Sequence, residues 1–316
     1  MGNDTNKGTV LVSGASGFIG RHLTKTLITE GRNVIALVRN VRKFSEQFVS
    51  SKINNLKVLE ADLADIKTLR NISEHIKGLC SLVHLGGYIL RSSAYAKDYE
   101  ANVSIDANIK GSYNLIKVLK PKLAYVCLIS TSDVYGIPRY LPFNEEHPVI
   151  PANFYAASKL AMELYVAIEL REAIPFSILR LAHVYGPGDP NPKVLQVFID
   201  NIRAGKNPVI YGDGSDLRDY VHVSDVVKVI VQSLLLKTSG IFNVATGKSF
   251  SLKEMAEIAI KASGKELKPI FKERNQPCID YSFDISKLKN EIGCPPQISI
   301  DQGVKELVND IQSLKN

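Results

Sequence analysis

The chain has 316 residues, of which 45% are hydrophobic and 22% charged, and 39 basic and 32 acidic side chains give a formal net charge of +7. This composition is typical of a globular protein and excludes a disordered or fibrous chain. The basic residues are spread without a dense run, so we expect an anionic small molecule rather than nucleic acid as the partner.

The polar N-terminus, MGNDTNKG, runs directly into an apolar stretch, so no signal peptide is expected. No apolar run reaches the ~20 residues of a membrane helix. The cysteines lack the spacing of a metal site, and we interpret them as buried, reduced thiols: Cys80, Cys127, Cys278 and Cys294. We therefore expect a cytoplasmic protein with no metal site and no membrane partner.

Short apolar stretches alternate with helix-length segments through the first 180 residues. We predict strands at 9–13, 33–38, 56–61, 81–85, 124–130 and 176–181. Continuous apolar strands separated by helices are typical of a parallel sheet that is covered on both faces. The sequence therefore predicts an α/β fold with a Rossmann-type doubly wound parallel sheet.

After Arg180 the sequence becomes rich in turns, at 185–192 and 211–216, with helices predicted near 194–204, 224–236 and 252–263. We predict a first domain over 1–181 and a smaller C-terminal lobe, mainly over 182–316, that we assign to substrate binding. The stretch GIFNVAT at 240–246 can return a strand to the main sheet. Segments near 220–246 are therefore expected to rejoin the first domain.

Three glycines, Gly14, Gly17 and Gly20, follow the first strand and lead into a helix predicted from about Phe18. Glycine permits a tight turn and a close backbone approach, and a helix N-terminus offers unpaired N–H groups to a pyrophosphate. A plain strand-to-helix turn is the alternative. We predict a dinucleotide site here, with Phe18 and Ile19 beside the glycines.

The end of the second strand determines which dinucleotide fits. The chain continues there as RNVRK from Arg39, without a carboxylate in reach that would accept the ribose 2′-hydroxyl of NAD. A guanidinium can pair with the 2′-phosphate of NADP, so the sequence favours NADP over NAD, and a solvated basic loop is the alternative. After the third strand, Asp62 can meet the adenine amino group, and we place Leu63 beside it.

The stretch YAASK places Tyr155 and Lys159 four residues apart in a predicted helix, so both project from one face. A close ammonium is expected to lower the pKa of the phenol, although such pairs are often merely exposed helical neighbours. The preceding strand ends in a cluster of hydroxyls, LISTSDVYG, that includes Thr131. Thr131 can hydrogen-bond the oxygen of a sugar carbon while Tyr155 takes its proton and a nicotinamide takes its hydride.

The motifs GASGFIG, STSDVYG, YAASK, LRLAHVYGPG, GDGSDLRDYVHVSDV and FNVATG stand in one order along nearly the whole chain. Together they resemble the extended short-chain dehydrogenase/reductase family, in particular its nucleotide-sugar epimerases and dehydratases of the UDP-glucose 4-epimerase type. The resemblance implies that Thr131, Tyr155 and Lys159 are the catalytic set, with Asn108 as a supporting residue.

The same resemblance implies that Arg218 and Arg274 bind the diphosphate of a nucleotide-diphosphate sugar. Two guanidiniums suit a doubly negative pyrophosphate, and two surface arginines are the alternative. The resemblance also implies a homodimer packed through the helices at 98–119 and 153–173.

The sequence departs from the family pattern at three places. The NAD-type aspartate is replaced at Val38 and Arg39, and His183 stands where Asn is usual. We place His183 near the substrate as a structural residue rather than a base. Asp133 stands where dehydratases usually carry Glu; it can protonate a leaving hydroxyl, or cap the following turn, and the cap is favoured.

The function favoured by the sequence is hydride transfer at C4 of a nucleotide-diphosphate hexose, giving 4-epimerisation. The alternatives are an NADPH-dependent reductase of a 4-keto sugar, for which Arg39 argues, and a 4,6-dehydratase. A dinucleotide-binding protein without turnover would have no use for Thr131, Tyr155 and Lys159 together.

Overall fold

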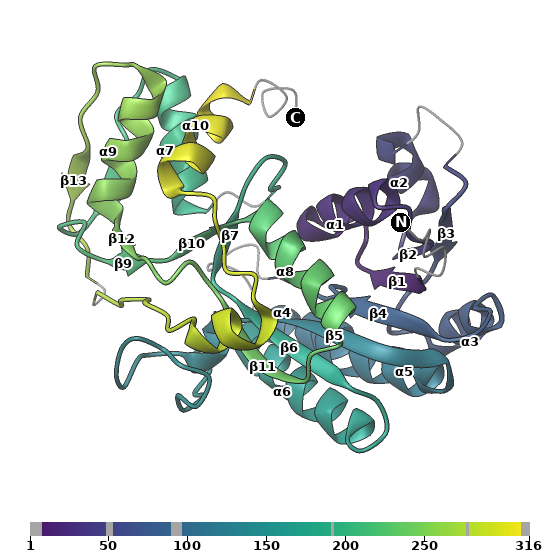
Figure 1. The fold of residues 1–316 in the computed structure, drawn as a ribbon. Helices are drawn as coiled ribbons and strands as arrows, with labels where there is room; N and C mark the ends of the chain where they lie inside the picture. Colours follow the sequence, from purple (N-terminus) through teal and green to yellow (C-terminus); the bar gives the residue numbers. More distant parts are fainter. Residues whose placement is uncertain (1–7, 49–52, 90–96, 191–192, 276–277, 311–316) are drawn as a thin grey trace. The chain divides into compact units, whose positions relative to one another are not determined.

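The computed structural model describes residues 8–48, 53–89, 97–190, 193–275 and 278–310 (Figure 1). The polar N-terminus before Gly8 and the end of the turn-rich stretch 185–192 lie outside the described residues. The chain forms two compact units. The first comprises Met1–Gly136, Val149–Arg180 and Val227–Phe242, and the second comprises Ile137–Pro148, Leu181–Val226 and Asn243–Asn316. The segment Ile137–Pro148 thus belongs to the second unit although it precedes most of that unit in sequence.

A seven-stranded sheet in the order β11-β6-β5-β4-β1-β2-β3 forms the centre of the fold. Its strands are β1 (Thr9–Ser13), β2 (Val34–Val38), β3 (Leu56–Glu60), β4 (Cys80–His84), β5 (Leu123–Thr131), β6 (Phe176–Leu181) and β11 (Gly240–Val244). The pairs β1–β2, β1–β4, β2–β3 and β4–β5 are parallel. The predicted Rossmann-type sheet is confirmed, and the stretch at 240–246 does supply a returning strand.

The sheet is buried on both faces, as its continuous apolar strands predict. All five residues of β2 are buried, and Leu11, Leu82 and Val126 of neighbouring strands are fully enclosed. Helices α3 (Ile66–Glu74), α5 (Gly111–Leu119) and α6 (Phe154–Leu170) cover one face, and α1 (Phe18–Thr29) covers the other (Figure 1). Leu69, Leu115 and Met162 of the three covering helices join the strand residues in one core.

The order of the strands reverses beside β1, because β2 follows on one side and β4 on the other. In doubly wound sheets, ligands bind in the crevice at the carboxyl ends of the strands at such a switch point. The turn after β1 and the loop after β4 therefore face the same crevice. The predicted glycine motif forms the turn after β1.

The remaining elements of the first unit are short or complete the helical layers. They are α2 (Val41–Phe48), α4 (Lys97–Ser104), the π-helix η1 (Ile105–Lys110), the 3₁₀ helices η2 (Lys120–Lys122) and η3 (Ser132–Tyr135), and most of α8 (Val223–Leu236). The π-helix continues α4 into α5 and carries Asn108, which is fully buried.

The second unit consists of helices around three two-stranded sheets. Its elements are β7 (His183–Tyr185), α7 (Val194–Arg203), β8 (Val209–Tyr211), β9 (Leu217–Arg218), β10 (Tyr220–His222), β12 (Phe250–Ser251), α9 (Leu252–Ser263), β13 (Ile270–Lys272), the π-helix η4 (Leu288–Ile292) and α10 (Ile300–Asn309). The second unit has its own apolar core, which includes Phe198, Met255 and Val304. A Ser251–Glu254 capping box starts α9, and Gly264 ends it in the left-handed conformation.

None of the four cysteines, all within the described residues, forms a disulfide, and Cys80 and Cys127 are buried in strands as expected. Cys278 is exposed, so the expectation of burial is wrong for that residue. Among the described residues, no helix is both long and apolar enough to cross a membrane.

Candidate active site

The glycine motif forms the tight turn between β1 and α1. Gly14 has a φ of +71°, which favours glycine, and its carbonyl oxygen accepts from the N–H of Gly17 at 2.9 Å. A Cβ on Gly20 would lie 2.8 Å from the Cα of Ala15, so only glycine fits there. Gly17 precedes α1, and no side chain of the described residues caps that helix. Its first N–H groups are available to an anion, so the turn fits a pyrophosphate.

Two further glycines, which the sequence analysis did not single out, follow β4. A Cβ on Gly86 would lie 2.8 Å from Cδ1 of Leu63, and a Cβ on Gly87 would lie 2.5 Å from Oδ1 of Asn108. Backbone therefore passes closely over these side chains. A pair of glycines directly after an apolar strand, HLGGY, was the available signal.

His84 links the two segments that border the crevice. Its Nδ1 lies 2.6 Å from the Ser13 hydroxyl at the end of β1, and its Nε2 lies 2.7 Å from the Ser112 hydroxyl on α5. The Ser13 hydroxyl also accepts from the N–H of Gly86 at 3.3 Å. Burial lowers the pKa of His84 to about 3, and Lys159 adds to this effect. His84 is therefore neutral and joins the end of β1 to α5, while Ser13 holds the loop after β4.

Thr131 and Tyr155 meet at the carboxyl end of β5. Thr131 is the last residue of the strand, and its hydroxyl accepts from the N–H of Asp133 at 3.2 Å. A hydrogen bond from Thr131 lowers the pKa of Tyr155, but burial and the neighbouring Asp133 carboxylate raise it above its usual range. The structure thus brings Thr131, Asp133 and Tyr155 together. Thr131 provides a side-chain cap of η3, and the role of Asp133 stays a prediction.

Lys159 lies one turn along α6 from Tyr155 and is buried. Its ammonium donates to the carbonyl oxygen of Ile129 at 2.7 Å and approaches the Met162 sulfur at 3.4 Å. Burial lowers the pKa of Lys159 to about 8, against the effect of the Glu163 carboxylate. The expectation of a lowered Tyr155 pKa is wrong, because burial of the phenol and the negative Asp133 dominate its surroundings.

Asn108 supports the helix that carries the phenol. Its Oδ1 accepts from the N–H of Tyr88 at 2.7 Å, and its Nδ2 donates to the Tyr88 carbonyl at 3.2 Å and to the Ser158 hydroxyl at 2.8 Å. Ser158 in turn donates to the carbonyl oxygen of Tyr155 at 2.8 Å. Asn108 is therefore a positioning residue that ties α6 to the loop after β4.

A buried ion pair lies behind the catalytic helix. Glu163 of α6 and Arg180 of β6 are 2.7 Å apart, and the hydroxyl of Ser130 donates to the same carboxylate. The Arg180 guanidinium also lies over the Tyr135 ring, 4.9 Å from its centre. Removing one partner of such a pair costs about 3–5 kcal/mol. The pair therefore locks α6 against the sheet, which fixes the position of Tyr155.

The corner after β2 differs from the expectation. Arg39 is exposed there, but the carboxylate of Glu60 at the end of β3 accepts from the N–H of Val41 at 3.4 Å. The statement that no carboxylate is in reach is therefore wrong, because β3 pairs with β2 and places Val38 beside Glu60. Asp62, just beyond β3, accepts from the N–H of Ala64 at 3.0 Å, so its proposed contact with adenine stays a prediction.

In the second unit, Arg218 and Arg274 share one buried carboxylate. Arg274 donates to Oδ2 of Asp216 at 2.5 Å, and Nη2 of Arg218 lies 3.9 Å from Oδ1. The Arg218 guanidinium also lies over the ring of Tyr281, 5.2 Å from its centre. The two arginines predicted to bind diphosphate are thus neighbours. Asp216, which the sequence analysis did not identify, holds them.

His183 lies among aromatic rings, 5.5 Å from Tyr220 and 5.6 Å from Tyr281. Burial lowers its pKa to about 3, and the positive Arg218 and Lys193 add to this effect. A neutral ring packed in this way suits a structural residue. Its proposed place near the substrate stays a prediction.

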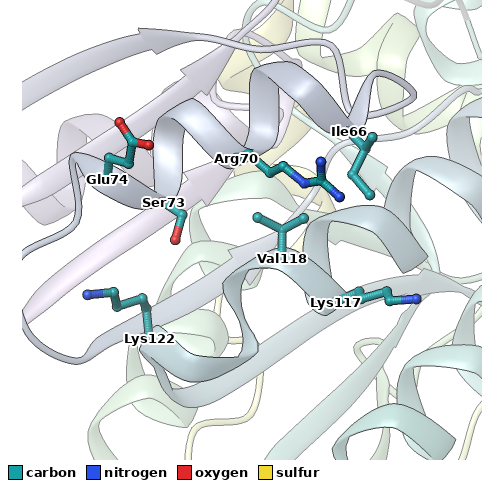
Figure 2. Close-up of a pocket in the computed structure, with 7 residues that line it drawn as sticks. All are labelled: Ile66, Arg70, Ser73, Glu74, Lys117, Val118 and Lys122. Atoms are coloured by element: carbon teal, nitrogen blue, oxygen red, sulfur yellow. The ribbon is translucent and has the colours of Figure 1, made fainter.

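A separate hollow of about 540 Å³ lies between α3 and the segment from α5 to η2 (Figure 2). Arg70 reaches into it from α3, opposite Val118 of α5, and Lys117 and Lys122 stand at its rim. None of the predicted site residues lines it. Among the described residues, no group of three or more His, Cys, Asp or Glu side chains is placed to hold a metal ion.

The fold and the glycine turn define a dinucleotide-binding protein of the Rossmann class. Residues 10–245 match the model of the NAD dependent epimerase/dehydratase family, and the chain belongs to this family of enzymes.

Individual relatives cover nearly the whole chain. A UDP-glucose 4-epimerase from Mycolicibacterium smegmatis is 31% identical over 310 residues, which are 94% of this chain and 96% of the relative. A dTDP-glucose 4,6-dehydratase from Actinoplanes sp. is 26% identical over 307 residues, 95% of this chain and 96% of the relative. The crystal structure of a UDP-glucose 4-epimerase with UDP-glucose from Thermotoga maritima, 26% identical, superposes with a TM-score of 0.83 over 98% of this chain and 100% of that chain.

Proposed function

We propose that this protein is an NAD(P)-dependent nucleotide-sugar 4-epimerase. The observation that carries the proposal is the meeting of Thr131 and Tyr155 at the end of β5, with Lys159 one helical turn away. The glycine turn and the β4 loop lie at the switch point of the same sheet, where doubly wound sheets bind their ligands. A similar enzyme is named as a UDP-glucose 4-epimerase.

In the proposed reaction, Tyr155 accepts the proton of the C4 hydroxyl and Thr131 hydrogen-bonds the same oxygen. A nicotinamide dinucleotide held at the glycine turn of Gly14, Gly17 and Gly20 would supply the acceptor and donor of the C4 hydride. Burial and the Asp133 carboxylate raise the pKa of Tyr155, so the phenolate that takes this proton needs a compensating positive charge. The Lys159 ammonium, one helical turn away, would supply it. Tyr155 finally gives the proton back to the C4 oxygen. The protein thereby returns to its starting protonation state, and no proton is gained or lost.

We propose that the first unit holds the dinucleotide and that the second unit binds the sugar nucleotide. Arg218 and Arg274 supply two positive charges, which match the two negative charges of a diphosphate. Asp216 keeps both guanidiniums in place before the ligand arrives, which reduces the entropy lost on binding.

A 4,6-dehydratase is the second candidate, and one observation favours it. Asp133 lies close enough to Tyr155 to raise the pKa of the phenol, so a carboxyl group is present beside the proposed base. As an acid, Asp133 can protonate a hydroxyl that leaves in β-elimination. A similar protein is named as a dTDP-glucose 4,6-dehydratase.

We also propose a homodimer in the cytoplasm. Large apolar side chains are exposed along neighbouring helices, namely Tyr99 of α4, Ile105 of η1 and Leu164, Tyr165 and Ile168 of α6. The exposed fraction of Ile168 is 71%. Both α4 and η1 pack against α6, and exposed apolar side chains gathered on neighbouring helices support an interaction surface.

Product analysis tests the function directly. We would incubate the purified chain with UDP-glucose, UDP-glucuronate and dTDP-glucose and identify the sugars by NMR. The proposal expects the C4 epimer of one substrate with no net change in reduced nicotinamide. A 4-keto-6-deoxy product would establish the dehydratase instead. Continuous oxidation of NADPH by a 4-keto sugar would establish the reductase.

A further inference from the structure

The corner after β2 carries a carboxylate that β2 itself does not supply. Glu60 ends β3, the edge strand of the sheet, and stands in register with Val38 at the end of β2. The backbone continues from both strands in parallel, since the N–H of Ala61 donates to the Val38 carbonyl at 2.9 Å. Glu60 therefore lies at the corner where the chain passes from β2 into α2.

The Glu60 carboxylate retains capacity to bind a ligand. Its contact with the N–H of Val41 uses one oxygen and is long, at 3.4 Å. An ionised carboxylate offers about four acceptor positions. Glu60 is also exposed, so a ribose hydroxyl can reach it without displacing packed side chains.

The same corner offers few free hydrogen-bond donors to a phosphate group. The Asn40 side chain accepts from the N–H of Lys43 at 2.8 Å, and Glu60 engages the N–H of Val41. Two of the backbone donors that an anion would use at the start of α2 are thus occupied. Glu60 adds a negative charge that repels a 2′-phosphate, and Arg39 supplies one positive charge against it.

We propose that Glu60 sets the cofactor preference, and that it directs the site toward NAD by accepting a hydrogen bond from the adenosine ribose. This inference rests on the proposed function, because it presumes a dinucleotide in the crevice. It replaces the preference for NADP that Arg39 alone suggested. Arg39 remains near the ribose but does not decide the preference.

Binding titrations test this assignment without relying on turnover. We would remove bound nucleotide from the full-length protein and measure Kd for NAD⁺ and NADP⁺ by calorimetry, in the native chain and in Glu60→Gln. The native chain should bind NAD⁺ more tightly. Glu60→Gln keeps the size and an acceptor oxygen but loses the charge, so it should shift the ratio of the two Kd values toward NADP⁺ by about tenfold.

Glu74→Gln serves as the matched control, since Glu74 is an exposed acid at the end of α3 and should leave the ratio unchanged. Arg39→Gln provides an independent measurement and should weaken NADP⁺ binding with less than about threefold effect on NAD⁺. A native preference for NADP⁺, or a ratio that Glu60→Gln does not move, would overturn the assignment of Glu60 and leave the proposed function intact. Failure of the native chain to bind either dinucleotide would overturn both.

Discussion

The side-chain amide of Asn108 donates to the Ser158 hydroxyl at 2.8 Å, and the Ser158 hydroxyl donates to the carbonyl oxygen of Tyr155. A residue on a π-helix thereby holds the backbone of the proposed catalytic tyrosine. Asn108 also satisfies both backbone groups of Tyr88. The position of the phenol depends on this network as well as on its own helix.

Asn108→Ala should lower kcat much more than it changes the KM for the sugar nucleotide, because the residue positions Tyr155 and does not touch the substrate. The buried groups left without partners should also reduce the free energy of unfolding by about 1–3 kcal/mol. Steady-state kinetics and urea unfolding measure the two effects. Asn114→Ala is the control, since the contacts of the Asn114 amide with the described residues are long, at 3.5 and 3.4 Å. Equal losses of kcat in both variants would argue against the positioning role.

Gly20→Ala should loosen the dinucleotide turn. The added Cβ would collide with the Gly14 carbonyl and the Ala15 backbone, and neither can move without opening the turn. We expect a loss of about 1–3 kcal/mol in the free energy of unfolding, as in other overpacked sites, and weaker dinucleotide binding. Gly8→Ala should change neither quantity, because the space around Gly8 is open. Unaltered dinucleotide affinity in Gly20→Ala would contradict the assignment of the turn.

Stability should fall in acid. Burial lowers the pKa of His84 and His183 from 6.5 to about 3, so the unfolded chain binds more protons than the folded chain between these pH values. The free energy of unfolding must then decrease as pH falls through this window. Asp219, whose pKa burial raises to about 6, acts in the opposite direction, but as one group against two.

Urea unfolding at about pH 7 and about pH 5.5 measures this dependence. His84→Gln should be less stable than the native chain at neutral pH, because Ser13 and Ser112 lose their partner. It should also reduce the pH slope by up to about 1.4 kcal/mol per pH unit. His75→Gln, at the exposed end of α3, is the control. An acid slope as steep in His84→Gln as in the native chain would show that groups other than His84 cause it.

Ile168→Glu should convert the proposed dimer into a monomer. The substitution places a charge on the most exposed of the large apolar residues of α4, η1 and α6, and a charge is costly to bury in an interface. Light scattering should give half the native mass. Leu235→Glu, also exposed but on α8, is the control. A native chain that is already monomeric would refute the dimer.

The strands of the main sheet and the longer helices could be predicted closely from the sequence. The predicted strand at 9–13 matches β1 in full, and the helix predicted near 252–263 matches α9, because apolar runs and a capping box are local signals. Local patterns also identified the glycine turn and predicted that Thr131 and Tyr155 belong to one catalytic site. The carboxylates of Glu60 and Asp216 could not be found in this way. Each acts on residues brought near it by strand pairing or by a distant loop, and no local motif records such contacts.

Turnover by Tyr155→Phe at equal dinucleotide occupancy tests the central claim most directly. The substitution removes only the phenolic oxygen, so the variant should fold, bind dinucleotide with native affinity and retain the packing of the ring. If Tyr155 moves the C4 proton, its kcat should fall by about 10²-fold or more. Native kcat in Tyr155→Phe, with the product unchanged, would contradict the account.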